Sequence, residues 1–262
     1  LGHTEENGVL VEPQKSKSAK IMKLLRNASK KGVRGGAPDY IVTFEDYSDL
    51  LIVIECKWDQ KKHRTKNLDN TADYACDGAV HYAAFLSKEY DVIAIGISGE
   101  SKDDLKVDTF LHLKGKHTAE DLNVQTLLKP NDYYKRYISS PQKFNEDYSA
   151  LLGYTQTLNN ELHEMKVKES QRSLFISAVL ICLQNEAFRS SYSKHKKAIN
   201  LCSSIYETVK SELEGDSGIP QSKVKMLENA YAFITSHSKL ASDKQKLVDL
   251  IKGIDQEVNG FM

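Results

Sequence analysis

Cysteine, net charge and long apolar runs are all scarce in this chain of 262 residues, and each shortage excludes a class of protein. The four cysteines form no Cys-x-x-Cys pair and have no histidines at zinc-finger spacing, so we expect buried, reduced thiols rather than a disulfide or zinc-finger scaffold. No apolar run reaches the ~18 residues that span a bilayer, and no apolar signal stretch opens the chain. These absences predict a cytoplasmic globular protein without a membrane partner.

The net charge is zero because 36 basic residues balance 36 acidic ones, but the charges are unevenly distributed. No acid lies between Pro13 and Pro38, and a second basic cluster begins at Lys57. A polyanion responds to the local field, so the balanced total does not exclude DNA as a partner. A solvated helix face is the alternative explanation for the first tract. The candidate DNA-backbone contacts are Lys15, Lys17, Lys31, Arg34, Lys61, Lys62 and Arg64.

Apolar periodicity divides the chain into two halves near residues 130–141. The first half predicts helices over 19–31 and 71–88, and strands over 40–44, 50–56, 91–98 and 107–113. The second half predicts a helix from Pro141, then helices near 170–189, 194–213, 220–237 and 242–259, the last with Ser242 and Gln245 as a capping box. We therefore expect an α/β domain over 1–135, with a mixed sheet flanked by helices, and an all-α linker or scaffold domain over 136–262.

One constellation of charged residues stands at the end of a strand that is otherwise apolar. Glu55-Cys56-Lys57 follows Leu-Leu-Ile-Val-Ile, and Pro38-Asp39 precedes the neighbouring predicted strand. Alternate residues of a strand share a face, so Glu55 and Lys57 point the same way and Cys56 points the other way. A hairpin of these two strands would bring Asp39 beside Glu55. The sequence thus predicts two carboxylates and one amine on one sheet surface.

These groups suit the hydrolysis of phosphodiesters. The carboxylates of Asp39 and Glu55, with the backbone carbonyl of Cys56, would form an oxygen site for Mg²⁺, with Mn²⁺ as a substitute. Lys57 would position the attacking water and offset negative charge in the transition state. The alternative is a solvated ion pair, because Glu-x-Lys triplets are common on exposed strands. A charged triplet that emerges from a buried strand favours the catalytic interpretation.

The segments Gly36-Ala37-Pro38-Asp39 and Ile54-Glu55-Cys56-Lys57 resemble the PD-(D/E)xK nuclease superfamily. With residues 11–16 and 77–83, they are similar to the N-terminal nuclease region of restriction enzymes, namely type I motor subunits and single-chain type IIG enzymes with an N6-adenine methyltransferase. The resemblance covers about residues 11–115. It implies a restriction-endonuclease-like core, with Asp39 and Glu55 as metal ligands and Lys57 as the catalytic lysine. It also implies a DNA endonuclease of a restriction-modification system that produces 5′-phosphate and 3′-hydroxyl ends.

Two positions depart from the pattern of that superfamily. Many relatives carry a glutamine four residues before a tyrosine in the helix after the lysine, whereas Gly78 stands four residues before Tyr82 here. Many relatives also add a metal-binding glutamate from the first helix. Glu5 and then Glu12 are our candidates for that ligand, and a solvated surface carboxylate is the alternative for each.

Several other residues have both a structural and a functional interpretation. We expect His81 and Tyr82 to form a packed core pair, His63 to lie exposed in a loop, and Trp58 to pack beneath the site rather than wedge against DNA. For Tyr133, Tyr134 and Tyr137 we expect packing between the domains rather than base stacking.

Motifs that are absent confine the prediction further. The chain has no P-loop and no Asn-Pro-Pro-Tyr-type methylase motif, so motor, methyltransferase or specificity parts would lie beyond this chain or on other subunits. The partner would be double-stranded DNA. The alternative functions are a catalytically silent DNA-binding or assembly module, and a nuclease of repair or recombination.

Overall fold

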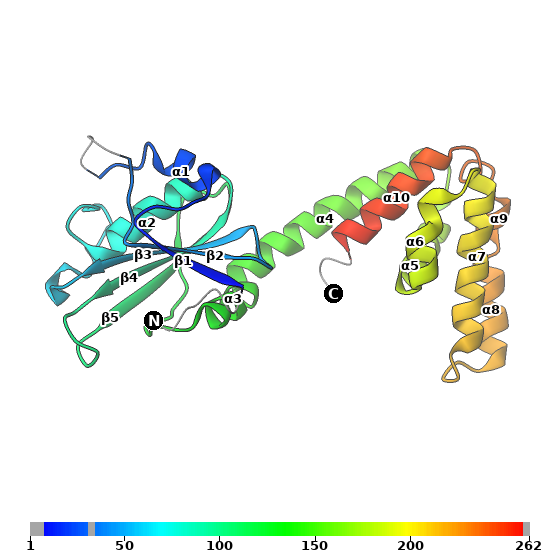
Figure 1. Cartoon of the computed structure of the whole chain (residues 1–262). Helices are drawn as coiled ribbons and strands as arrows, with labels where there is room; N and C mark the ends of the chain where they lie inside the picture. The colour runs from blue at the N-terminus through cyan, green and yellow to red at the C-terminus, as the bar shows by residue number, and fades with distance from the viewer. Residues whose placement is uncertain (1–7, 31–34, 259–262) are drawn as a thin grey trace. The chain divides into compact units, whose positions relative to one another are not determined.

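A computed structural model of the protein describes residues 8–30 and 35–258 (Figure 1). Glu5, Lys31 and Arg34, three of the candidate site residues, lie outside this described part. The chain divides into two compact units, Leu1–Asn145 and Glu146–Met262. The division falls within helix α4 (Pro141–Glu164), C-terminal to the boundary that we expected from the sequence. We call the two parts the sheet unit and the helical unit.

The sheet unit is built on one six-stranded mixed sheet whose strands follow their order in the chain. Only β3 and β4 run parallel, and helix α2 lies between them in the sequence. The predicted class, a mixed sheet flanked by helices, is confirmed, whereas β1 and β6 were not predicted. The strands are β1 (Val9–Pro13), β2 (Tyr40–Phe44), β3 (Leu50–Lys57), β4 (Asp91–Ser98), β5 (Lys106–His112) and β6 (Glu120–Asp121).

Helices cover both faces of this sheet (Figure 1). Helices α1 (Ala19–Leu25) and α2 (Ala75–Leu86) pack on the face that carries Ile41 and Val53. Helix α3 (Pro130–Ile138) places Tyr133 and Tyr137 among the buried residues of the opposite face. The prediction that these tyrosines pack between the domains was therefore wrong. Glu55 lies on this same α1/α2 face, because it is two residues from Val53 on β3 and alternate residues of a strand share a face.

The first two helices are shorter than their apolar pattern predicted. Helix α1 ends at Leu25, and not near residue 31, because the Leu25 carbonyl accepts hydrogen bonds from the backbone N–H groups of Ala28 and Gly36, at 3.0 and 2.7 Å. These turn and loop bonds replace the next helical bond. Helix α2 begins at Ala75 rather than near residue 71. The Asp77 carboxylate on its first turn accepts backbone bonds from Thr65 and Asn70 at 3.0 and 2.9 Å, and so holds the preceding loop against the helix.

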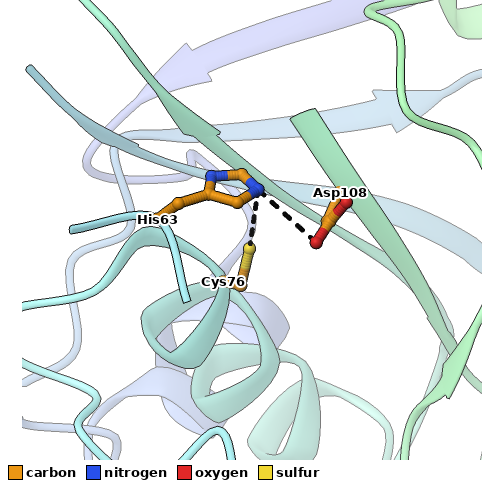
Figure 2. Close-up of side chains that lie close together, drawn as sticks. All are labelled: His63, Cys76 and Asp108. Atoms are coloured by element: carbon orange, nitrogen blue, oxygen red, sulfur yellow. Dashed lines mark hydrogen bonds and ion pairs between the residues drawn. The ribbon is translucent and has the colours of Figure 1, made fainter. Parts of the chain in front are cut away.

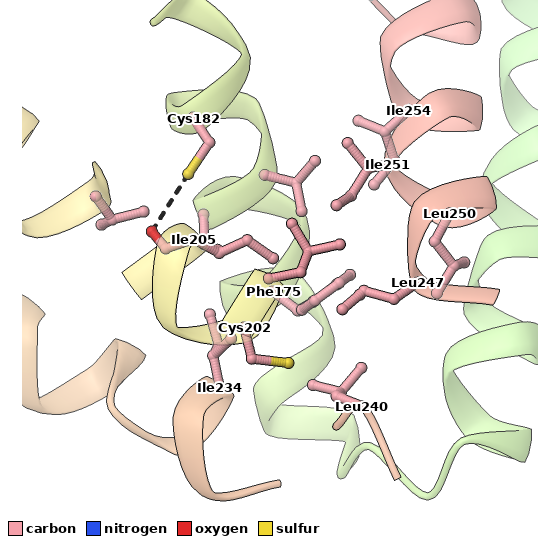
Figure 3. Packing of buried hydrophobic residues seen from close by; sticks show 14 of the residues in the cluster. Phe175, Cys182, Cys202, Ile205, Ile234, Leu240, Leu247, Leu250, Ile251 and Ile254 are labelled. Carbon is pink, nitrogen blue, oxygen red and sulfur yellow. Dashed lines mark hydrogen bonds between the residues drawn. The ribbon is translucent and has the colours of Figure 1, made fainter. Parts of the chain in front are cut away.

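The helical unit encloses its own apolar core (Figure 3). The predicted helix over 170–189 is two helices, because the Asn185 side chain caps the second one by accepting from the Phe188 N–H at 3.0 Å. The last helix is capped by Asp243, which accepts from the Lys246 N–H at 3.0 Å, so the predicted Ser242 cap was wrong. After α4, the helical unit contains α5 (Glu169–Gln184), α6 (Glu186–Ser191), α7 (Ala198–Gly215), α8 (Gln221–Tyr231), α9 (Phe233–Ser236) and α10 (Lys244–Glu257).

All four cysteines are free thiols, as predicted, and Cys76, Cys182 and Cys202 are buried while Cys56 is half-buried. Over residues 8–30 and 35–258, no helix is both long enough and apolar enough to cross a membrane.

Candidate functional site

The structure brings Asp39, Glu55 and Lys57 together where β2 begins and β3 ends. Tyr40 pairs with Ile54 in the antiparallel register, which places Asp39 beside Glu55. The Lys57 ammonium lies 2.9 Å from Glu55 Oε1, so these two side chains share a face. Asp39 Oδ2 accepts a hydrogen bond of 2.7 Å from the backbone N–H of Cys56. Two carboxylates and one ammonium thus lie at the C-terminal end of the buried strand β3.

The backbone carbonyl of Cys56 points toward β2, the strand that Asp39 precedes. The carbonyl of Lys57 accepts from the Gly99 N–H at 3.0 Å, so it points toward the β4 side of β3. Strand residues alternate in direction, which turns both the N–H and the carbonyl of Cys56 toward β2. Continued beyond Tyr40, the register sets Pro38 opposite Cys56, and proline has no N–H to donate. This carbonyl is therefore left without a ladder donor from the β2 side.

Lys30 is a member of the site that the sequence did not single out. Its ammonium lies 2.5 Å from Glu55 Oε1 and 4.5 Å from the centre of the Tyr82 ring, and its side chain is 10% exposed. Burial lowers the pKa of Lys30, and the neighbouring Glu55 opposes that effect. Gly78 makes the approach possible, because a Cβ on Gly78 would stand 2.5 Å from the Lys30 ammonium. The sequence showed Gly78 only as a departure from the family pattern, and the space that it leaves for Lys30 appears in the structure.

The donor atoms of this site fit a small divalent cation. Glu55 is 4% exposed, and its Oε2 is buried without a hydrogen-bond partner in the part of the chain that the structure describes. Asp39 uses Oδ2 for the Cys56 N–H, and no described residue bonds its other oxygen. Carboxylate and carbonyl oxygens are the ligands of Mg²⁺, which keeps several waters besides. An open hollow of about 400 Å³ adjoins Asp39, and it is lined by Pro13, Gln14, Asp39, Tyr40 and Cys56.

Glu12 lies on the same sheet face, since it pairs with Ile41 in the β1–β2 register. Its Oε1 accepts from the Lys17 N–H at 2.6 Å, and its Oε2 accepts from the Ser16 hydroxyl. These bonds give the buried Glu12 a local role in fixing the connection between β1 and α1.

The candidate DNA contacts that the structure describes are all exposed. Lys15 and Lys17 lie between β1 and α1, and Lys61 and Lys62 belong to the 3₁₀ turn Gln60–Lys62 that follows β3. The Arg64 guanidinium forms an ion pair of 2.9 Å with Asp108 on β5.

Two predictions around the site were wrong in opposite directions. Trp58 is 74% exposed and does not pack beneath the site, because it directly follows Lys57, where β3 leaves the core. His63 is buried and not exposed, because its ring lies among Ser98, Cys76 and Asp108. The expected packing of Tyr82 is confirmed, since it is 4% exposed and its hydroxyl accepts from the Ala37 N–H at 3.3 Å.

No protein-family model, curated protein or solved structure matches this chain. What the site can do is therefore argued from its own residues and their geometry.

Proposed function

We propose that the sheet unit is a Mg²⁺-dependent DNA endonuclease, the cutting part of a restriction-modification enzyme. The observation that carries the proposal is the buried Oε2 of Glu55, which has no hydrogen-bond partner among residues 8–30 and 35–258, on the strand end where Asp39 bonds the Cys56 backbone. An uncompensated carboxylate oxygen in the interior is costly, and a metal ion would compensate it. Lys30 and Lys57 both form ion pairs with Oε1, the other carboxylate oxygen of Glu55, so two cations already lie beside this carboxylate.

Each residue then has a role in the hydrolysis. Asp39, Glu55 and the Cys56 carbonyl hold Mg²⁺ or Mn²⁺, which when bound polarises the scissile phosphate and lowers the pKa of a coordinated water. Lys57 directs the attacking water and offsets the charge that grows on the phosphate oxygens. Lys30 holds the Glu55 carboxylate in position through its ion pair. Direct attack by water leaves 5′-phosphate and 3′-hydroxyl ends, as the resemblance to the PD-(D/E)xK nucleases implies.

Double-stranded DNA would reach this site along exposed basic residues. Lys15 and Lys17 lie on the β1 side, and Lys61 and Lys62 lie just beyond the C-terminal end of β3. Lysines contact phosphates without reading sequence. The exposed Trp58 beside Lys57 offers an aromatic surface to the duplex or to an unstacked base. Recognition of a DNA sequence would then come from methyltransferase, specificity or motor modules outside these residues.

Plasmid cleavage tests the proposal most directly. Supercoiled plasmid with Mg²⁺ should be nicked or cut by the wild-type chain, and Lys57→Ala and Asp39→Ala should slow this by about a hundredfold or more, since each removes transition-state stabilisation. The exposed Lys225→Ala and Asp103→Ala serve as matched controls and should cut at the wild-type rate. Wild-type activity no greater than that of the two site variants contradicts the proposal for this chain.

Metal binding separates a nuclease from a silent module. Calorimetry should detect Mn²⁺ binding that Asp39→Ala weakens and Asp103→Ala does not. DNA binding without cleavage, together with Mn²⁺ binding that is indifferent to Asp39→Ala, would favour a silent DNA-binding or assembly module. Cleavage restricted to branched DNA would favour a repair or recombination nuclease.

A further inference from the structure

A second group of ligand-type side chains lies on the other side of the first turn of α2 (Figure 2). His63 follows the 3₁₀ turn after β3, Cys76 is in the first turn of α2, and Asp108 is in β5. His63 Nε2 lies 3.6 Å from Cys76 Sγ and 3.5 Å from Asp108 Oδ2. One ligand atom from each residue lies within 4.8 Å of the others. Three segments that are distant in the sequence thus direct a nitrogen, a sulfur and an oxygen at one point.

The two separations from His63 fit a zinc tetrahedron. Zinc binds imidazole and carboxylate at about 2.0–2.2 Å and thiolate at about 2.3 Å, so neighbouring ligand atoms of a tetrahedral site stand about 3.3–3.6 Å apart. The two measured separations from His63 lie within or close to that interval. A mixed nitrogen, sulfur and oxygen set also suits zinc better than Mg²⁺, which prefers oxygen alone.

The surroundings hold these side chains in place. The Ser98 hydroxyl, fully buried, lies 2.9 Å from His63 Nδ1, which orients the ring with Nε2 toward the other two residues. The backbone N–H of Cys76 donates to the His63 carbonyl at 2.9 Å, so the two residues move together. Gly96 pairs with Asp108 in the register of β4 and β5, and a Cβ on it would stand 2.5 Å from the Cys76 sulfur. The bare glycine therefore opens the space in which the thiol sits.

We propose that His63, Cys76 and Asp108 bind a Zn²⁺ ion that fastens the connection between β3 and α2 to β5. The proposal is independent of the nuclease function, because it rests on different residues. Three protein ligands leave one zinc position for water. Binding replaces the thiol proton of Cys76 by the metal and releases that proton to solvent.

Arg64 competes with the metal for Asp108. Its Nη1 lies 2.9 Å from Asp108 Oδ2 and 3.9 Å from Asp121 Oδ2, so the guanidinium has a second carboxylate to turn to when the metal binds. Removal of this competing cation should tighten zinc binding. Removal of a ligand should weaken it. The opposite signs at two residues in contact give the proposal a test that nonspecific binding to a thiol would fail.

The experiment titrates the chelator-treated full chain with Co²⁺ and then displaces the cobalt with Zn²⁺. Wild type should show one equivalent of cobalt with a near-ultraviolet thiolate charge-transfer band. Cys76→Ala should lose the band and weaken zinc binding by about a hundredfold or more, because it removes a ligand, whereas loss of a side chain that only orients a ligand already costs about 10–100-fold. Cys202→Ala, the matched buried thiol of the helical unit, should leave both unchanged, and Arg64→Ala should tighten the binding.

The opposite results overturn the proposal. They are the absence of the band in wild type, a band that persists in Cys76→Ala, or a band that is lost in Cys202→Ala. If Cys76→Ala fails to fold, Asp108→Asn decides, because it alters a side chain that is 13% exposed and keeps its shape. Weakened zinc binding in Asp108→Asn supports the site, and unchanged binding refutes it. No readout depends on DNA cleavage, so failure of this site and failure of the nuclease remain distinguishable.

Discussion

The sheet unit buries charged and polar side chains, and the helical unit buries apolar ones. Over the described residues, every buried polar or charged side chain belongs to the sheet unit. They are Glu12, Ser16, Glu55, His63, Asp77, Ser87, Asp91, Ser98, Thr109, His112 and Ser140. The buried core of the helical unit consists of apolar residues and two cysteines. A buried polar group costs free energy unless it is paired, so the sheet unit gives up stability at Glu55 Oε2, which has no hydrogen-bond partner among the described residues.

Both candidate sites lie in the sheet unit. Within the sheet unit, Glu55, Gly96 and Asp108 occupy one row across β3, β4 and β5. The oxygen-rich site lies at one end of that row, and the His63–Cys76–Asp108 group lies at the other. The first turn of α2 sits against Gly96 between them. Among the described residues of the helical unit there is no comparable group of metal-ligand side chains.

The largest effect should come from breaking the apolar core of the helical unit. Phe175 is fully buried there, and Phe175→Ala should destabilise the helical unit by about 3–5 kcal/mol through lost burial and a cavity. Thermal unfolding followed by circular dichroism measures the loss. Plasmid cleavage below the melting temperature should be unchanged if the helical unit only supports the sheet unit. A matched loss of cleavage in the folded variant would show that the helical unit takes part in the reaction.

The residues of the oxygen site differ in how far the sequence could predict them. The pairing of Asp39 with Glu55 and the shared face of Glu55 and Lys57 follow from a short hairpin and strand alternation, which are local. Lys30 joins the site only because α1 ends early, the chain turns back, and Gly78 leaves a space on α2. Contacts that depend on the packing of distant segments leave no periodic signal.

The errors at His63 and Trp58 have the same physical origin. His63 stands in a polar, basic segment that reads as solvent-exposed, and it is buried by Ser98 and Asp108 from strands β4 and β5. Trp58 is the only tryptophan and was expected inside, yet it stands just past the end of β3. Composition gives the average burial of a residue type, whereas the register of the sheet decides the individual case.

Adding one methyl group to a glycine in each unit sharpens the comparison. In Gly78→Ala the new Cβ would stand 2.5 Å from the Lys30 ammonium and 3.1 Å from Glu55 Cγ, so it should displace Lys30 and cost about 1–3 kcal/mol. Gly153→Ala in α4 meets no atom within 4 Å and should stabilise the chain by roughly 0.5–1 kcal/mol. Urea unfolding measures both. With Lys30 displaced from Glu55, Mn²⁺ binding in Gly78→Ala should tighten; equal stability changes in the two variants would argue against the close approach of Lys30.

Acid should weaken the sheet unit through its buried histidines. Burial lowers the pKa of His63, His81 and His112 below the ordinary value of 6.5. Below pH 6.5 the unfolded chain therefore binds more protons than the folded one, and stability falls by at most about 1.4 kcal/mol per pH unit for each histidine. Hydrogen exchange at about pH 7 and about pH 5 should show the loss in the sheet unit. His112→Leu should reduce it, and the exposed His117→Gln should not.

The smallest effect should come from a charge pair on the surface of the helical unit. Arg189 contacts Asp255 at 2.8 Å, but its side chain is 54% exposed, so solvent screens the pair. Arg189→Ala should therefore change the free energy of unfolding by less than about 1 kcal/mol, and added salt should shrink the difference further. Lys30→Ala in the sheet unit removes a cation that is 10% exposed from the same kind of contact, and should cost more because it leaves Glu55 buried with one partner fewer. Equal, small losses in both variants would mean that burial does not set the strength of these pairs, and the contrast between the units would then rest on their apolar cores alone.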